Sequence, residues 1–593
     1  MAEVEKEIHS WRNAVALLTR ILRTDTLVIG SGLAGCYAAI ELNKRGIDVT
    51  VLEKSIFGKS GSSVMGSRFS VHSFDPNPLS NWGGGPYVQP GLIDDPELRK
   101  KHAQQTEGNS QTAWSFVAEL ENMGVYFRRH PDGTIWPESG GGVHSVKTDQ
   151  AGKVIMQVLG AEVKRRNIRI FEMTMATKIL TKNGRVVGVI ALDIKNGEVF
   201  AFATKAVIMA TGDTSWYPTS TVPETLSGDG FAMAYRAGAE LADLCELIFY
   251  NYKNPKVPPR TWRFAVASWN IKPLDFTEPE ALNSKGEKIW EKDEYKSLFD
   301  TARAQGMDGK ILDIPLWLKT YVNAKEIAAN RGTDREGVYV SYRGMKDAGK
   351  LMKDTWARYE FFKRMGIDPS KDNIEVGVVP HIDRGGIMTN VKLESTTLPG
   401  LYAIGGTLSG VGGMIGCVAT GKWVAESVEE ISGGIEIPAL DSSQIEEEEE
   451  RIMSFIGTSK DIGTISPPKV KRMIKEIMQE KCPYWKHEKT LTDGLQELRR
   501  IRNEVIPKMK TESDSMACNQ GLVDALEAVN LLDLWEIHAE MALMKKESRG
   551  FFRRLDYPEE SKFFTGVRFR LANGERKYRV VSVPIPGFEA FAG

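Results

Sequence analysis

The feature that most constrains this chain is a glycine-rich turn that joins a predicted strand to a predicted helix. Residues 24–30 (TDTLVIG) are apolar and rich in β-branched side chains, and residues 36–46 have a helical pattern. The turn GSGLAG (30–35) connects them, and a second strand pattern follows at residues 47–53. This order of strand, turn, helix and strand predicts a βαβ unit, in which the two strands are parallel.

The glycine spacing indicates what the turn binds. In a G-x-G-x-x-G turn, Gly30 permits the tight bend, Gly32 lets the backbone approach a pyrophosphate, and Gly35 allows close packing of helix and strand. Glu53 ends the second strand 18 residues after Gly35, where it can accept a hydrogen bond from a ribose hydroxyl. A chance glycine turn is the alternative, but strand, helix and acidic residue are all in register, which favours a dinucleotide site.

Two later segments indicate that the dinucleotide is FAD rather than NAD. ATGD (210–213) follows an apolar strand, and LYAIGG (401–406) follows the turn LPG. The second segment continues through further glycines into another helical pattern, an arrangement that an NAD enzyme does not need. A chain that returns twice to one long cofactor fits FAD better, so FAD is the expected cofactor.

Composition excludes several other classes of protein. The 77 Lys and Arg residues almost balance the 78 Asp and Glu residues, which argues against a mainly electrostatic nucleic-acid binder. The five cysteines contain no CxxC pair, which suggests neither a disulfide framework nor an iron–sulfur or zinc cluster within the chain, and no metal site is expected. Neither a signal peptide nor an apolar run long enough to span a membrane is evident. We therefore expect a cytoplasmic protein.

The order of the patterns predicts four units along the 593 residues. A discontinuous nucleotide-binding domain is expected at 22–240 and 375–435, because strand and glycine signals return after a segment of different character. The Pro-rich and Trp-containing segment 241–374 is expected to form an inserted capping domain. Residues 436–550 are mostly helical in pattern, and residues 551–593 form a basic, β-rich tail.

Several segments resemble the flavoprotein superfamily of fumarate reductase and succinate dehydrogenase, from about Thr24 to Pro558. They are GSGLAG, ATGD, SGDGFAMAYRAGAEL, NSKGE, HIDRGGIMTN, LPGLYAIGG and KESRGFFRRLDYP. The resemblance implies the α/β class, with a Rossmann-like FAD-binding domain interrupted by an α+β capping domain, then a helical domain and a β-containing tail. It also implies that substrate is held between the cap and the flavin.

The chain departs from this superfamily at positions that concern flavin attachment and substrate. Gly61, in KSGSSVMGS, stands where many members attach FAD to a histidine, which implies noncovalent FAD. Asn251 aligns with the HPTG motif, no RGEGG precedes NSKGE, and Met414 replaces the arginine of GANRLG. A dicarboxylate needs cationic partners, usually arginines, so these changes weaken the expectation of succinate or fumarate.

At these positions the chain resembles the alpha subunit of adenylylsulfate reductase, a branch of the superfamily, more closely. The similar segments are KSGSSVMG, SWYP (215–218), NSKGE, GVGGMIGCVATG and ESRGFFRRLDY. The resemblance implies a noncovalent FAD subunit that exchanges two electrons with a small anionic substrate and passes them to a separate ferredoxin-like iron–sulfur subunit. The alternatives are a fumarate or enoate reductase, a succinate dehydrogenase-like enzyme, and a flavin-binding electron-transfer subunit without its own substrate site.

His381 is the leading catalytic candidate, because it begins HIDRGG and falls where the superfamily places an active-site histidine. A histidine can donate to an oxyanion or transfer a proton near neutral pH. Arg384 and Arg263 are the candidates for holding an anionic substrate, with Arg260 beside the latter; solvated or salt-bridging arginines are the alternative. The expected FAD-binding residues are Gly30, Gly32, Gly35, Glu53, Lys54, Ser60, Gly61, Ser62, Gly66, Thr211, Gly212, Trp216, Asp229, Gly405 and Gly406.

Trp216 is expected either to form an aromatic wall against the flavin or to pack in the core. His144 is a weaker candidate than His381, because it lies in a glycine-rich loop without a matching motif. Arg549, Arg553 and Arg554 match the ESRG segment and the arginines after it. They could serve the substrate, the flavin or a partner interface, although structural ion pairing is the default expectation.

Overall fold

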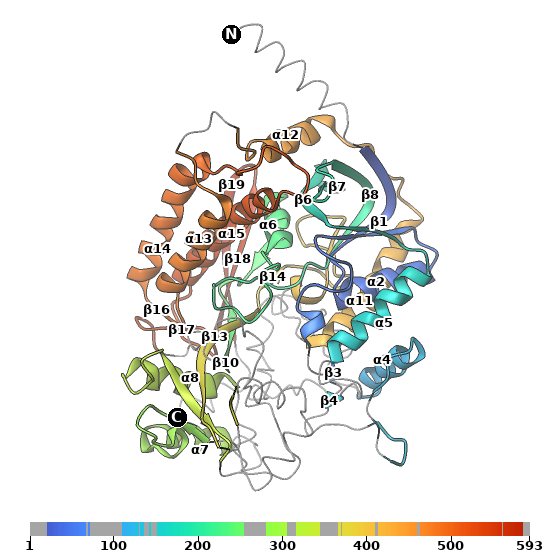
Figure 1. Cartoon of the computed structure of the whole chain (residues 1–593). Helices are drawn as coiled ribbons and strands as arrows, with labels where there is room; N and C mark the ends of the chain where they lie inside the picture. The colour runs from blue at the N-terminus through green and yellow to red at the C-terminus, as the bar shows by residue number, and fades with distance from the viewer. Residues whose placement is uncertain are drawn as a thin grey trace.

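The computed structural model describes most of the chain, including the glycine turn at 30–35 and the segments 210–213 and 401–406 that return to it. The described residues are 20–66, 69–70, 110–127, 129, 131–135, 142–143, 151–253, 280–304, 316–343, 366–368, 371–408, 413–458, 463–559, 561 and 563–584. The large sheet and its helices lie to the right in Figure 1, the helical segment to the upper left, and a smaller sheet with α7 and α8 below it.

A seven-stranded sheet contains the predicted βαβ unit. Its strands are β1 (Arg20–Ile29), β2 (Val49–Glu53), β5 (Arg169–Glu172), β6 (Thr174–Lys182), β7 (Arg185–Asp193), β8 (Val199–Met209) and β15 (Leu401–Ala403). The order is β5-β2-β1-β8-β7-β6, with β15 also paired to β8. The strands β1, β2, β5, β8 and β15 are parallel, so their carboxyl ends meet at one edge of the sheet.

Helices α2 (Leu33–Lys44), α5 (Ala151–Arg165) and α11 (Gly413–Ser432) lie together beside this sheet (Figure 1). Small residues let α2 and α11 approach closely, because a Cβ at Gly421 would lie 3.0 Å from the carbonyl oxygen of Ala34. Short elements near these helices are α4 (Ser110–Asn122), β3 (Phe69–Ser70), β4 (Gly142–Val143), η1 (Ser63–Met65) and η6 (Gly405–Thr407). Further helical turns lie elsewhere: η4 (Ile289–Glu291) beside α7 (Asp293–Ala304), and η7 (Ile501–Val505) and η8 (Ile506–Lys508) after α14 (Glu488–Arg500). The glycine turn is therefore fixed between a buried sheet and two packed helices.

A second, antiparallel sheet lies within the predicted cap. It consists of β10 (Leu247–Lys253), β11 (Glu280–Leu282), β12 (Gly337–Ser341) and β13 (Ile374–Asp383), in the order β10-β13-β12-β11. Helices α7 (Asp293–Ala304) and α8 (Leu316–Ala328) accompany it. The long strand β13 crosses the predicted boundary at residue 375 and carries the chain from this sheet back toward the large one. The domain boundaries themselves remain predictions.

The predicted helical segment contains α12 (Ser442–Met453), α13 (Pro467–Lys481), α14 (Glu488–Arg500) and α15 (Gln520–Met544). Helix α15 contacts α13 and α14 on one side and α6 (Asp229–Arg236) of the nucleotide-binding segment on the other. Leu522, Leu526 and Leu532 of α15 are buried, and so are Trp535 and His538 further along the helix. Because α15 is surrounded in this way, it joins the helical segment to the large sheet.

The tail forms the predicted β structure, a hairpin of β18 (Phe563–Ala572) and β19 (Glu575–Pro584). A separate two-stranded sheet joins β16 (Trp485–Lys486) to β17 (Arg553–Arg554). In the sheet of the tail, β18 pairs with β9 (Leu241–Ala242), which pairs with β14 (Gly386–Ile387). Beneath this sheet, Arg568 and Lys545 contact the fully buried carboxylate of Asp243. The tail is thus anchored to the body by a buried ionic cluster.

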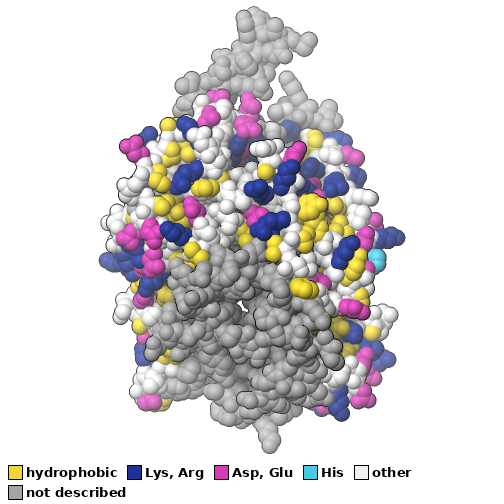
Figure 2. All heavy atoms as spheres, turned by 180° about the vertical axis from the view of Figure 1, so that it is seen from behind, with side chains coloured by type: hydrophobic (Ala, Val, Ile, Leu, Met, Phe, Trp, Pro, Cys, Tyr) yellow, Lys and Arg dark blue, Asp and Glu magenta, His cyan; other side chains and the backbone are white. Residues whose placement is uncertain are grey.

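The surface is consistent with the near-neutral composition. Figure 2 shows the face opposite to that of Figure 1, on which basic and acidic side chains are interspersed among hydrophobic ones over the part that the structure describes. Of the helices whose residues are described, none has both the length and the apolar character that crossing a bilayer requires.

Candidate functional site

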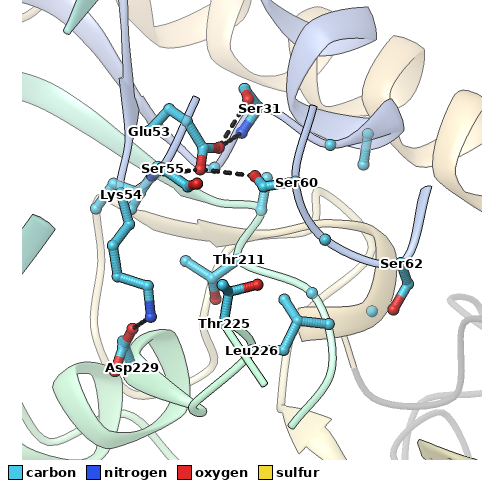
Figure 3. Close-up of a pocket in the computed structure, with 18 of the residues that line it drawn as sticks. Ser31, Glu53, Lys54, Ser55, Ser60, Ser62, Thr211, Thr225, Leu226 and Asp229 are labelled. Atoms are coloured by element: carbon cyan, nitrogen blue, oxygen red, sulfur yellow. Dashed lines mark hydrogen bonds and ion pairs between the residues drawn. The ribbon is translucent and has the colours of Figure 1, made fainter. Parts of the chain in front are cut away.

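A pocket lies where β1, β2 and β8 end, at the edge of the sheet where dinucleotides bind in open α/β folds (Figure 3). Three loops provide most of its lining: the glycine turn after β1, the segment after β2, and the segment after β8. Residues from the start of α6 and from the last glycine turn complete it. The lining residues are 29–34, 52–55, 60–63, 174–176, 210–213, 225–229, Met233, Ile404, Gly406 and Cys417.

The glycine turn requires glycine for steric reasons. Gly30 has a φ of +104°, and a Cβ built there would lie 2.4 Å from the carbonyl oxygen of Ala210 on the neighbouring strand. A Cβ at Gly35 would lie 2.0 Å from the carbonyl oxygen of Gly30. The pocket wall is consequently bare backbone at the start of α2, which suits the close approach of a pyrophosphate to helix amides. These residues fit the dinucleotide that the sequence predicts.

Glu53 holds the loops of the pocket together. One of its carboxylate oxygens accepts hydrogen bonds from the backbone amide of Ser31 at 3.0 Å and the Ser31 hydroxyl at 2.7 Å. The other accepts from the amide of Ser55 and the hydroxyl of Ser60, both at 2.8 Å (Figure 3). The buried carboxylate therefore fixes the glycine turn relative to the loop after β2, and contact with a ribose hydroxyl remains a prediction for it.

Lys54 is the one lysine or arginine among the described lining residues of this pocket. Its ammonium group contacts the Ser227 hydroxyl at 2.7 Å, the Asp229 carboxylate at 2.6 Å and the carboxylate of Glu527, on α15, at 2.6 Å. Burial acts to lower the pKa of Lys54, but the two carboxylates outweigh it and raise the pKa above its usual value. The side chain therefore stays charged at the pocket wall.

Two carboxyl groups, of Asp213 and Asp383, connect the pocket to strand β13. Asp213 lines the pocket after β8, and burial raises its pKa to about 7. Asp383, at the end of β13, accepts a 2.7 Å hydrogen bond from the amide of Thr214 and another from the indole of Trp216. Burial and the nearby Asp213 raise the pKa of Asp383 to about 8. These contacts bring the HIDRGG segment against the loop that follows β8.

His381 is held close to this junction. Its Nδ1 lies 2.6 Å from the hydroxyl of Thr221, and the amide of Thr221 donates to the carbonyl oxygen of Pro380 at 3.1 Å. Burial lowers the pKa of His381 to about 3, so the imidazole is neutral at physiological pH. Arg384 is buried and lies over the ring of Phe551, with 5.9 Å between the guanidinium carbon and the ring centre.

Most of the predicted cofactor residues come together. The lining includes Gly30, Gly32, Glu53, Lys54, Ser60, Gly61, Ser62, Thr211, Gly212, Asp229 and Gly406. Gly35, Gly66 and Gly405 lie outside the lining but pack next to it, where a Cβ would crowd Gly30, Met414 and Ala34 respectively. Arg263, Arg260 and His144 lie outside the described residues.

Trp216 takes the second of the two positions expected for it. Its ring lies 4.8 Å from that of Trp535 and 5.0 Å from that of His538, and its indole donates to Asp383. It is buried in this aromatic cluster and is not among the lining residues of the pocket. The structure therefore places Trp216 in the core rather than on the pocket wall.

Arg549, Arg553 and Arg554 are buried and have structural partners. Arg554 contacts Asp556 at 2.6 Å, Arg549 contacts Glu547 at 3.1 Å, and Arg553 lies over the ring of Tyr321. The default expectation of structural pairing accounts for these contacts.

Sequence reasoning missed several residues at the site. Asp213 is part of the ATGD motif, yet nothing local to that motif indicates its proximity to Asp383. Ser31 lies inside the glycine turn, where a hydroxyl next to an acidic residue at the end of the second strand is a usable signal. Glu527 is 473 residues from Lys54, so no spacing rule could connect the two.

Comparison with known proteins adds independent findings. The chain matches the family model described as FAD binding domain over residues 25–69, 97–251 and 318–416, and the model described as fumarate reductase flavoprotein C-term over residues 471–576. It is 27% identical to an uncharacterised FAD-dependent oxidoreductase of Methanocaldococcus jannaschii, covering 92% of this chain and 96% of that protein. It is 26% identical to a subunit of the fumarate reductase (CoM/CoB) of Methanothermobacter marburgensis, over 91% of this chain and 96% of that one.

A solved structure shows the same fold. The adenylylsulfate reductase of Archaeoglobus fulgidus superposes with a TM-score of 0.75 at 20% identity and covers 97% of both chains. The predicted fold class, an α/β nucleotide-binding domain with a cap, a helical segment and a tail, is confirmed by this superposition. The two matched models also confirm the resemblance drawn from the sequence motifs.

Proposed function

Because the chain belongs to the FAD-binding flavoprotein family of the fumarate reductases and succinate dehydrogenases, we propose that it transfers two electrons between noncovalent FAD and a small anionic substrate. The family membership makes the chain an FAD-dependent oxidoreductase with FAD as its cofactor. The binding mode of the FAD, the substrate and the electron partner are the proposed parts.

The observation that carries the proposal is the junction between the pocket and His381. Hydrogen bonds from Thr214 and Trp216 to Asp383 hold the end of β13 against the loop after β8, and that loop lines the pocket. His381 lies two residues before Asp383. Buried contacts to Asp383 thus fix the end of β13 next to the loop that lines the pocket, which supports a catalytic role for His381.

The candidate residues of the site each have a defined part in this proposal. FAD, when bound, supplies the capacity to accept or give two electrons. The backbone of the glycine turn from Gly30 to Gly32 would hold the pyrophosphate, and Glu53 would keep that turn in place. His381, as a neutral imidazole whose Nδ1 is engaged by Thr221, would present Nε2 to the substrate; when Nδ1 accepts from the Thr221 hydroxyl, Nε2 carries the N–H that donates to a substrate oxygen. Thr221 would orient the ring through its hydrogen bond to Nδ1.

Gly61 supports the noncovalent binding mode. It lies in the pocket lining and has no side chain with which to form a bond to the flavin. A covalent link at this position of the superfamily requires a histidine. We therefore expect acid precipitation of the purified protein to release all of its FAD into the supernatant.

The proposed electron partner is a separate ferredoxin-like iron–sulfur subunit. The relative from Methanothermobacter marburgensis is itself named as one subunit of an enzyme, and the motifs shared with adenylylsulfate reductase imply the same arrangement. The cysteine spacing of this chain provides no CxxC motif of its own. Electrons would then pass between the FAD and a cluster in another chain.

Two substrate classes are proposed for the same site. A sulfur oxyanion such as adenylylsulfate is favoured by Gly61 and Met414, which stand where dicarboxylate enzymes of the superfamily have a histidine and an arginine. An unsaturated carboxylate is favoured by the printed name of the relative, which is part of a fumarate reductase. Both classes are anions, and the buried guanidinium of Arg384, three residues after His381, carries the positive charge that either would need.

The test is an anaerobic titration of the purified, FAD-loaded protein. The flavin is reduced with dithionite, the excess reductant is removed, and adenylylsulfate, fumarate or a related enoate is added while the flavin absorbance band is recorded. The proposal predicts stoichiometric reoxidation by one class, and its loss in H381Q, with FAD content unchanged. Reduced flavin that persists with every anion would instead indicate an electron-transfer subunit without a substrate site.

A further inference from the structure

One charged residue of the cofactor pocket wall is held by a residue from outside the nucleotide-binding segment. Glu527 belongs to α15, within the region that matches the C-terminal model of the fumarate reductase flavoproteins. Its carboxylate is almost completely buried and contacts the ammonium group of Lys54 at 2.6 Å. Lys54 follows Glu53 directly and lines the pocket, so the helical segment reaches the pocket through an ion pair.

The pair is the centre of a larger charged cluster. The second oxygen of Glu527 accepts from Lys471 of α13, and Lys471 also contacts Asp524 at 3.0 Å. On the other side, Asp229 contacts Lys54 at 2.6 Å and accepts a 2.8 Å hydrogen bond from the amide group of Asn530. Two contacts therefore join α15 to this wall of the pocket: Glu527 through Lys54, and Asn530 through Asp229.

Glu527 is held as a carboxylate in this position. Burial acts to raise its pKa, but Lys54 and Lys471 outweigh it and lower the pKa to about 2. Lys54, in contrast, keeps about a fifth of its side chain exposed, at 19%. A ligand in the pocket removes water from that exposed part, and an ion pair becomes stronger when the surrounding dielectric constant falls. A bound ligand would in this way strengthen the Lys54–Glu527 contact.

We propose that Glu527 is a positioning residue of the cofactor site, which holds Lys54 at the pocket wall and couples FAD binding to the docking of α15. The inference rests on FAD as the ligand of the pocket and is independent of the substrate. Coupling of this kind is reciprocal: if docking of α15 strengthens FAD binding, FAD strengthens the docking of α15 by the same factor.

The first measurement is FAD affinity of the cofactor-free full chain, followed by quenching of flavin fluorescence. E527Q places an amide between Lys54 and Lys471, so its NH₂ group faces one ammonium and can no longer neutralise both. We expect a Kd for FAD about tenfold higher than that of the wild type, a size typical of coupled neighbouring residues. E527D, which keeps the charge on a shorter side chain, should recover part of the affinity.

The second measurement separates positioning from a merely structural role. Hydrogen exchange of α15 amides is compared with and without FAD. In the wild type, FAD should slow exchange around residues 522–530, and in E527Q this FAD-dependent slowing should be smaller. A change that only destabilises α15 would speed exchange equally in both states and leave the difference between them unchanged.

E536Q provides a matched control on the same helix. Glu536 is as deeply buried as Glu527 and also has two cationic partners, Arg502 and Arg576, but neither it nor these partners are among the described residues that line the pocket. It should lower stability without altering the Kd for FAD or the FAD-dependent protection. If E527Q does not fold, K54M tests the same contact from the pocket side.

The outcomes distinguish this proposal from the function itself. Failure of the wild type to bind FAD would contradict the cofactor assignment. Tight binding by the wild type together with an unchanged Kd and unchanged FAD-dependent protection in E527Q and K54M would overturn the coupling and leave the cofactor assignment intact. Equal loss of affinity in E527Q and E536Q would also overturn it, because a general loss of stability would then explain both.

Discussion

Replacement of Gly35 by alanine tests whether the glycine turn is fixed by steric contact. The added Cβ would lie 2.0 Å from the carbonyl oxygen of Gly30 and 3.3 Å from the Cβ of Ala210. The Gly30 oxygen cannot retreat easily, because Gly30 itself lies against the backbone of Ala210. The start of α2 must therefore move away from the turn by more than about 1 Å, roughly the gap to ordinary van der Waals contact.

The magnitude follows from two opposing effects. Overpacking of a tight contact costs about 1–3 kcal/mol and sometimes more. Alanine in a helix gains about 0.5–1 kcal/mol relative to glycine, which offsets part of this cost. We expect G35A to be destabilised by roughly 2 kcal/mol. Because the displaced turn is also the proposed pyrophosphate site, we expect FAD binding to lose at least about 1.4 kcal/mol, which corresponds to about a tenfold fall in affinity.

Gly160 provides the matched control, because it is also a helical glycine, within α5, and has room for a methyl group. A Cβ there would meet its nearest neighbour, a ring carbon of Phe57, at 3.7 Å. G160A should therefore be neutral or slightly stabilising, with unchanged FAD binding. Chemical unfolding and FAD titration of the two variants give the comparison. If G35A is as stable as G160A and binds FAD as tightly, the steric account of the turn is refuted.

Three further predictions concern single ionisable groups. Because the pKa of Asp213 is raised to about 7, the folded cofactor-free protein binds a proton that the unfolded chain releases above about pH 4. The free energy of unfolding should therefore fall as pH rises from about 4 to 8. Chemical unfolding of D213N should show a smaller fall over this range. His381 has the opposite effect on the pH dependence, because its pKa is lowered to about 3, so stability is lost as pH falls below about 6.5. H381Q should therefore lose less stability than the wild type between about pH 7 and 5. Its turnover should fall about 100-fold or more. K545M leaves Asp243 and Glu246 buried with fewer cations and should cost about 3–5 kcal/mol in unfolding experiments, with FAD affinity of the folded protein unchanged.

The parts of the site that are local in sequence were predictable. The roles of Gly30 and Gly35 follow from a turn of six residues, and the structure supplies the contacts that make glycine necessary there. Spacing alone assigns Glu53 to the ribose. The structure adds that its carboxylate is already hydrogen-bonded to Ser31 and Ser60, which depends on how the loop after β2 folds back.

The remaining features depend on contacts between distant segments. Trp216 donates to Asp383 across 167 positions in the sequence, which places the indole in the core. Asp383 lies inside HIDRGG, but the motif gave no sign of this contact. Arg568 of the tail reaches Asp243 across 325 positions. Such pairs are set by the packing of whole elements, so periodicity and spacing carry no information about them.

We propose that this chain reduces or oxidises a small anion directly at noncovalent FAD. The most direct measurement is the anaerobic addition of adenylylsulfate, fumarate and related enoates to the dithionite-reduced, FAD-loaded protein, with the flavin spectrum as readout. We expect full reoxidation of the flavin by one of these anion classes, and release of all FAD on acid precipitation of the same sample. A flavin that stays reduced with every anion, or that stays attached to the precipitated protein, would contradict it.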